Sequence, residues 1–107
     1  MVVGDGANSI SKASGGWTLS WQGTGHTNDE FSNGESILEG IRQLVNEAGG
    51  RVIYSESGEI PYPVDAVIAV YGEDPYAEFQ GDREHLDFES NGFDVNLLAE
   101  YLSLIHI

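Results

Sequence analysis

The sequence predicts an α/β fold in which a partial, mostly parallel sheet is flanked by helices. Two observations carry this prediction: residues 66–71 form a continuous apolar run, and residues 37–48 carry an apolar stripe with helical spacing. An apolar run without alternation is typical of a parallel strand that is covered on both faces. Extended segments that alternate with helices are typical of layered α/β folds. We expect the sheet to be truncated at both ends of the chain.

The chain begins with Val2 and Val3, which resemble the last two residues of a buried strand. Strands typically run about five or six residues, so this one is expected to be clipped. Residues 4–34 contain seven glycines and many Ser, Thr and Asn residues, and they predict a long loop. Loops longer than about 15 residues inside compact domains are usually functional.

A helix is expected next. Ser32 and Glu35 have the spacing of a capping box, and two glycines at 49 and 50 supply a stop signal. The apolar stripe between them consists of Ile37, Leu38, Ile41, Leu44, Val45 and Ala48. Residues 51–55 then predict a strand, and residues 66–71 predict a second one. A last helix is expected to begin near Asp94.

Charge and composition exclude several classes of function. The chain has 18 acidic and 4 basic side chains and a net charge of −14. Because so few cations cannot neutralise many phosphates, we expect neither nucleic acid nor an anionic membrane as a partner. No apolar run approaches the roughly 20 residues of a membrane helix. The sequence has no cysteine, which excludes disulfides and thiolate sites, and residues 1–3 show no export signal.

Two loops are candidates for a site, because ligands of open parallel sheets bind outside the carboxyl ends of the strands. One loop begins at Gly4 and the other, residues 72–82, begins at Gly72. The second loop contains four carboxylates, Glu73, Asp74, Glu78 and Asp82. A carboxylic acid in a partly apolar pocket near other carboxylates has a raised pKa and can donate a proton near neutral pH. The alternative is an acidic loop that simply faces water.

The first loop contains Trp17 and Trp21. Trp17 follows two glycines in a polar stretch, and two alternatives stay open for it: an exposed ring that stacks on a sugar, or a buried ring. Trp21 lies nearer the expected packed elements, and we expect it in the core.

Other motifs give weak signals. Residues 4–9 hold two of the three glycines of a dinucleotide-binding fingerprint, with Ser9 in the third place. His26, His85 and His106 have no metal-type spacing to one another. We therefore expect neither a cofactor nor a metal.

Together these motifs resemble the second domain of family 3 glycoside hydrolases, which are β-glucosidases and exo-acting β-glucan glucohydrolases. The stretch Gly-Gly-Trp-Thr-Leu-Ser-Trp-Gln-Gly at 15–23, the helix at 36–48 and the acidic loop at 72–82 follow the order of that domain. The resemblance implies that residues 1–101 are part of its C-terminal, flavodoxin-like three-layer α/β sandwich. Residues 102–107 do not resemble the family and are interpreted as a tail.

The resemblance implies a retaining enzyme that removes glucose from the non-reducing end of β-glucans or cello-oligosaccharides. In that family a barrel domain supplies an Asp nucleophile, and the second domain lends the acid/base. The acid/base falls on Glu73, with Glu78 as the second choice, and Trp17 falls on one wall of the sugar slot. Because the barrel sequence is missing from this chain, we expect the isolated chain to be inactive. We also expect marginal stability or self-association, and a periplasmic or secreted parent enzyme.

Two other functions stay open. A carbohydrate-binding module without catalysis would use Trp17 and the acidic loop to hold a glucan. A flavodoxin-like nucleotide-binding domain would need phosphate contacts at residues 4–9, which the acidic surface opposes.

Overall fold

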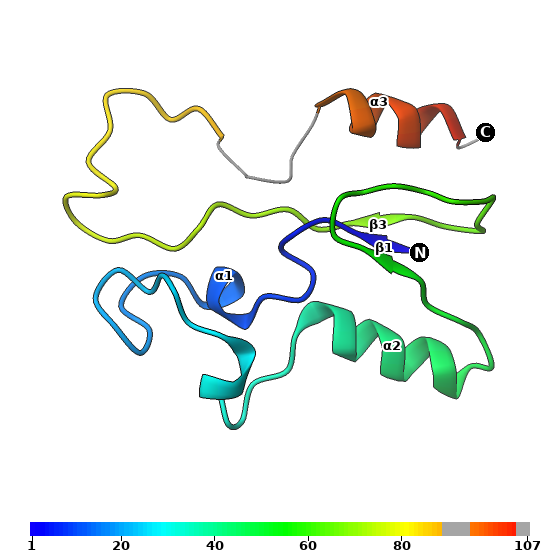
Figure 1. The fold of residues 1–107 in the computed structure, drawn as a ribbon, viewed down its shortest axis with the longest axis horizontal. Helices are drawn as coiled ribbons and strands as arrows, with labels where there is room; N and C mark the ends of the chain where they lie inside the picture. The colour runs from blue at the N-terminus through cyan, green and yellow to red at the C-terminus, as the bar shows by residue number, and fades with distance from the viewer. Residues whose placement is uncertain (89–94, 105–107) are drawn as a thin grey trace.

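The computed structural model describes residues 1–88 and 95–104. Its centre is a parallel sheet in the order β2-β1-β3, formed by β1 (Val2–Val3), β2 (Tyr54–Ser55) and β3 (Ile68–Ala69). Val2 pairs with Tyr54 on one side and with Ile68 on the other. Figure 1 shows α2 (Ile37–Glu47) on one side of the sheet and α3 (Val95–Leu104) on the other. The predicted α/β fold with a parallel sheet between helices is confirmed.

The core lies where β1 meets α2. Val2, Ala7 and Leu38 form a buried cluster. Four partly buried side chains pack around it: Ile41, Val52, Tyr54 and Val70. Burial of a Val or Leu side chain contributes about 1.5–3 kcal/mol, so each member matters in a core of this size.

Helix α2 begins later than predicted. The N-cap is Ser36, whose hydroxyl accepts a hydrogen bond from the Glu39 N–H, while the Glu39 carboxylate accepts one from the Ser36 N–H. The capping box is thus Ser36 with Glu39, and the prediction of Ser32 with Glu35 is wrong. The physical reason is tertiary: the Leu38 N–H donates to the Ala7 carbonyl at 2.8 Å, which fixes the helix start against the first loop.

The strands are shorter than predicted. β2 covers two residues of the predicted 51–55, and β3 covers two residues of the predicted 66–71. Residues 66–71 were expected to be covered on both faces, and this expectation is wrong, because none of these six side chains is buried. Ile68 is 45% exposed, because β3 is an outer strand of this sheet. The last predicted helix corresponds to α3; Asp94 and His106 lie outside the described residues.

The long first loop contains structure that sequence analysis missed. Helix α1 (Ile10–Ser14) begins after Ser9, whose hydroxyl accepts a hydrogen bond from the Lys12 N–H, and a 3₁₀ turn η1 (Asn28–Glu30) follows. Ser9 in front of an apolar residue was an available N-cap signal. In residues 1–88 and 95–104, no helix is long and apolar enough to span a membrane.

Candidate active site

Two loops leave the carboxyl end of the sheet side by side, as predicted. The Gly6 N–H donates to the Val70 carbonyl at 3.0 Å, which joins the loop after β1 to the segment after β3. Gly4 has a φ of +103°, and a Cβ there would lie 2.2 Å from the Val70 carbonyl oxygen. Only glycine therefore lets the first loop turn here.

Lys12 of α1 ties the two loops together. Its Nζ lies 2.9 Å from Asp5 Oδ2 and 3.0 Å from Asp74 Oδ1, and it donates to the Gly72 carbonyl at 2.8 Å. Burial alone would lower the pKa of Lys12, but hydrogen bonds to the two carboxylates and their charges outweigh it and raise the pKa above 10.5. Lys12 was not predicted as a site residue, although it stands out as the chain's single lysine.

Glu73 stands at the start of the acidic loop, directly after Gly72. It is half-buried, and the Tyr76 hydroxyl donates a hydrogen bond to its Oε2 at 2.8 Å. This hydrogen bond, followed by the negative charge of Glu73, raises the pKa of Tyr76. Glu73 is thus an oriented carboxyl group that is partly shielded from water and still reachable from outside, as a general acid requires.

Both tryptophans of the first loop bind Glu78 of the acidic loop. Glu78 Oε2 accepts hydrogen bonds from Trp17 Nε1 at 3.2 Å and from Trp21 Nε1 at 2.7 Å. The two indole rings lie 6.1 Å apart at 46°, and Phe79 meets Trp21 edge-on at 5.6 Å. The hydrogen bond from Trp21, with that from Trp17 as a smaller cause, lowers the pKa of Glu78 below its ordinary value. This carboxylate is therefore ionised at neutral pH.

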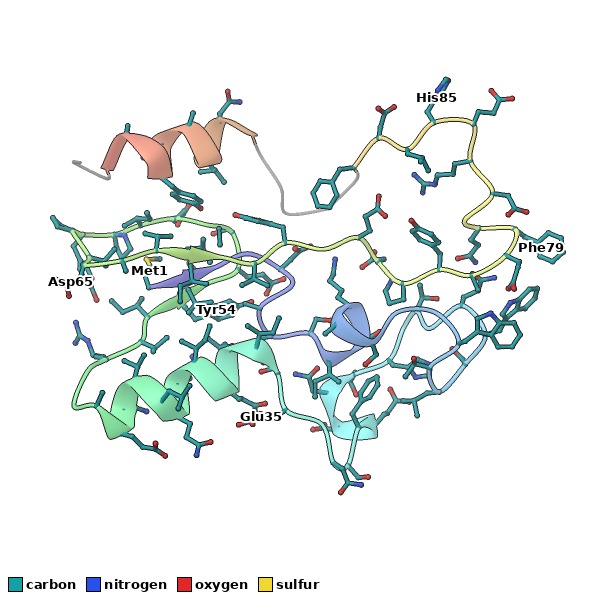
Figure 2. All side chains as sticks on the ribbon, turned by 180° about the vertical axis from the view of Figure 1, so that it is seen from behind. Met1, Glu35, Tyr54, Asp65, Phe79 and His85 are labelled. Atoms are coloured by element: carbon teal, nitrogen blue, oxygen red, sulfur yellow. The ribbon has the colours of Figure 1, made fainter. Side chains whose placement is uncertain are left out.

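These aromatic rings are exposed: Trp17 by 70%, Trp21 by 44% and Phe79 by 75%. Of the two alternatives for Trp17, the exposed ring is confirmed. The expectation that Trp21 lies in the core is wrong, because its N–H finds an acceptor at the surface, as an indole requires. Figure 2 shows Phe79 at the end of the molecule opposite Asp65.

The side chain of Gln22 locks the two loops to each other. The Gln22 amide donates to the Glu78 carbonyl at 2.9 Å, and the Ala77 N–H donates back to Gln22 Oε1 at 2.7 Å. A Cβ at Gly16 would lie 2.2 Å from the Tyr76 carbonyl oxygen. The glycine before Trp17 therefore allows the close approach of the loops.

Three bulky residues of this region have a left-handed backbone. The φ values are +61° at Trp17, +60° at Leu19 and +73° at Phe79. Such residues are rarely found there, and they persist where the surrounding contacts over-determine them. Here the Trp17 N–H donates to the Trp21 carbonyl at 2.8 Å. Strain of this kind clusters at functional sites.

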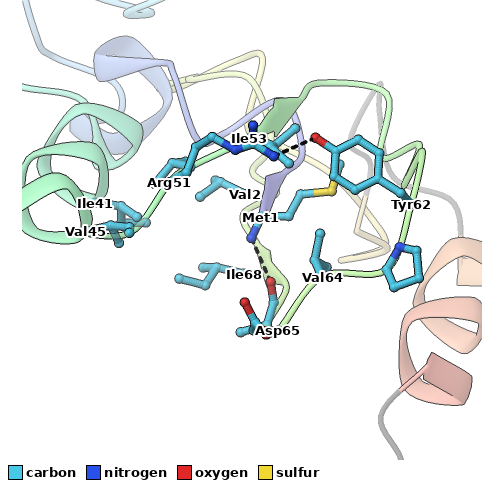
Figure 3. Close-up of a pocket in the computed structure, with 14 residues that line it drawn as sticks. Met1, Val2, Ile41, Val45, Arg51, Ile53, Tyr62, Val64, Asp65 and Ile68 are labelled. Carbon is cyan, nitrogen blue, oxygen red and sulfur yellow. Dashed lines mark hydrogen bonds between the residues drawn. The ribbon is translucent and has the colours of Figure 1, made fainter. Parts of the chain in front are cut away.

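A cavity of about 370 Å³ lies at the amino end of the sheet (Figure 3). Most of its lining is apolar and includes Met1, Ile41, Val45 and Val64, and none of the predicted site residues lines it. Because open parallel sheets bind ligands at their carboxyl ends, the two loops are the better candidate. In the part of the chain that the structure describes, no group of three or more His, Asp or Glu side chains could hold a metal ion.

Comparisons with known proteins point to one class of enzyme. No protein-family profile matches this sequence. A lysosomal beta glucosidase of Dictyostelium discoideum is 34% identical over 85% of this chain. Two structures of an exo-1,3/1,4-beta-glucanase (ExoP) from a Pseudoalteromonas species, one of them a point variant, are 50% and 47% identical, with TM-scores of 0.78 and 0.79 over 82% and 92% of this chain. The chain spans 13% of the length of the curated relative, and 11% and 16% of the two solved chains.

Proposed function

Because this chain is homologous to a segment of family 3 glycoside hydrolases, we propose that it carries the acid/base half of a retaining β-glucosidase or exo-β-glucanase site. The observation that carries this proposal is that Glu73 and an exposed tryptophan pair lie on two interlocked loops at the carboxyl end of a parallel sheet. A proton donor beside aromatic rings suits a glucoside, whose sugar ring has apolar faces. The proposed substrate is the non-reducing end of a β-glucan or cello-oligosaccharide.

Glu73 is the proposed acid/base. In retaining hydrolysis one carboxylate attacks the anomeric carbon while a carboxylic acid protonates the departing oxygen. The resulting carboxylate then takes a proton from water, and this water attacks the anomeric carbon and releases the sugar from the nucleophile. The two carboxyl groups sit only about 5–5.5 Å apart. The proposed nucleophile belongs to a barrel domain, which is the proposed partner of this chain. The Tyr76 hydroxyl would orient Glu73 through its 2.8 Å hydrogen bond.

Glu78 is the second choice for the acid/base, and its contacts favour Glu73 instead. One oxygen of Glu78 accepts two indole hydrogen bonds, and these lower its pKa. Both indoles donate to the same Glu78 oxygen, so this carboxylate is already engaged in holding the two tryptophans. We therefore assign proton transfer to Glu73 and sugar contact to Trp17.

A chimera tests the proposal directly. The chain replaces the matching segment of the ExoP enzyme, and hydrolysis of an aryl β-glucoside is measured. We expect activity, and a fall in kcat of about 10²–10⁴-fold in Glu73→Gln. The control Glu84→Gln changes an exposed carboxylate just after the acidic loop and should leave kcat unchanged. Full kcat in the Glu73→Gln chimera would contradict the proposal.

The isolated chain supplies a second test. We expect no turnover, because the placement of both reacting groups contributes on the order of 7–11 kcal/mol to catalysis. Clear turnover that disappears in Glu73→Gln would show that the chain needs no barrel domain.

A carbohydrate-binding module without catalysis is the second candidate, and the exposure of Trp17 favours it. A glucan pull-down with wild type and Trp17→Ala, read together with the activity of the chimera, separates the two candidates. Binding that depends on Trp17, together with a chimera that lacks activity, would favour the module.

A further inference from the structure

We propose that Glu78 is a positioning residue that holds Trp17 and Trp21 as one preorganised aromatic platform for glucosyl units. This inference rests on the proposed function of the site. Glu78 itself contacts neither sugar nor reacting atoms in this proposal, and it acts through the two indoles.

The geometry of the shared hydrogen bonds carries the inference. Trp17 and Trp21 donate to the same atom, Glu78 Oε2, at 3.2 and 2.7 Å, from positions 61 and 57 residues away in the chain. A carboxylate oxygen can accept more than one donor. Because both indole N–H groups point at one atom, the two rings cannot turn independently, and their separation of 6.1 Å and angle of 46° are set together.

Glu78 is fixed by its own backbone, so the bridge is anchored at both ends. Its carbonyl accepts a hydrogen bond from the Gln22 amide, and Gln22 in turn accepts one from Ala77. On the other loop the Trp17 N–H donates to the Trp21 carbonyl. The contact therefore closes a ring of hydrogen bonds between two loops.

Without the bridge, two largely exposed indoles would have to be ordered when a sugar binds. Ordering such side chains on binding weakens affinity, and for two of them we expect a loss on the order of tenfold. Chemistry at Glu73 should be affected much less, because Glu73 receives its hydrogen bond from Tyr76 instead.

The first experiment uses NMR on the full 107-residue chain. The indole Nε1–H resonances of both tryptophans should move together in Glu78→Ala, because both lose one acceptor. In Glu78→Gln they should move less, because an amide oxygen can still accept. The control Glu84→Ala should leave both resonances in place. If only one indole resonance moves in a Glu78→Ala spectrum that is otherwise unchanged, the shared bridge is overturned.

The second experiment uses the ExoP chimera with cello-oligosaccharides. Glu78→Ala should raise KM on the order of tenfold with kcat nearly kept, whereas Glu73→Gln should lower kcat. An unchanged KM in Glu78→Ala overturns the positioning role. An unchanged kcat in Glu73→Gln instead overturns the proposed function, so the two failures are distinguishable. A chimera without activity also counts against the proposed function, and the NMR result then decides the bridge.

Discussion

Replacement of Lys12 with methionine should destabilise the chain by roughly 2–3 kcal/mol. The Lys12 side chain is 12% exposed and that of Asp5 is 9% exposed, whereas Asp74 is 57% exposed. Loss of one partner of a buried pair costs about 3–5 kcal/mol, and an exposed pair contributes about 0–1 kcal/mol. The Asp5 pair is still slightly exposed, so its loss is expected to cost a little less than the first class, and the Asp74 contact belongs to the second.

Urea unfolding followed by tryptophan fluorescence and far-UV circular dichroism measures this loss. The double variant Lys12→Met with Asp5→Asn should regain part of the lost stability, because it no longer leaves a nearly buried carboxylate without that counter-charge. The control Arg42→Met removes an exposed cation of α2 and should change stability by less than about 0.5 kcal/mol. A Lys12→Met variant as stable as the control, or a double variant no more stable than the single one, would contradict this prediction.

The contacts of Lys12 also predict how the stability of the chain depends on pH. The folded state raises the pKa of Lys12 above 10.5, so the folded state binds this proton more tightly than the unfolded state. The resulting stabilisation is complete below pH 10.5 and is lost as the pH rises through the folded pKa. The difference between wild type and Lys12→Met should therefore be constant around neutral pH and shrink in alkaline solution.

Three further predictions concern packing. Leu38→Ala should cost about 2–5 kcal/mol in urea unfolding, because Leu38 is fully buried; Leu44→Ala, on the exposed face of the same helix, is the matched control. Gly16→Ala should destabilise the chain by about 1–3 kcal/mol, because the new Cβ meets the Tyr76 carbonyl; equal urea midpoints for variant and wild type would contradict this. The chain should self-associate in sedimentation velocity as its concentration rises, and a monomer boundary at every concentration would show otherwise.

The positions of the two loops were predictable because their causes are local. Apolar runs without alternation mark parallel strands; Gly4 directly follows β1, and Gly72 follows β3 after two further residues. Once the strands are parallel and adjacent, the loops that follow them must leave the same edge. Glu73 then lies at that edge because only Gly72 separates it from the second run. The acidic loop could therefore be placed at that edge from the sequence, whereas the roles of Glu73 and Glu78 come from the resemblance and stay predictions.

The start of α2 could not be predicted, because two capping boxes with the same spacing compete. Ser32 with Glu35 and Ser36 with Glu39 are equivalent by sequence. The hydrogen bond from the Leu38 N–H to the Ala7 carbonyl decides between them, and the partner in this contact lies far back in the chain.

The exposure of Trp21 and the role of Lys12 were missed for the same reason. The acceptor of the Trp21 indole is 57 residues away, and Lys12 donates to the Gly72 carbonyl 60 residues away. Neither contact produces a periodic pattern, since each depends on how two loops approach each other. The role of Glu73 as acid/base, the domain boundary at residue 101 and the location of the parent enzyme stay predictions.

The large exposed surface of the chain bears on how water would be excluded from the proposed site. It exposes 7394 Å², roughly 1,500 Å² more than a compact protein of this size, which is about twice the area that one partner buries in a protein interface of standard size. The loops position Glu73 and the tryptophans through contacts made within the chain, by Lys12, Gln22 and Glu78. Contacts within the chain do not exclude water from Glu73 to the same degree, because Glu73 is only half-buried. A carboxyl group gains the raised pKa of a general acid by losing its solvent, so the proposed chemistry requires a second surface to cover Glu73.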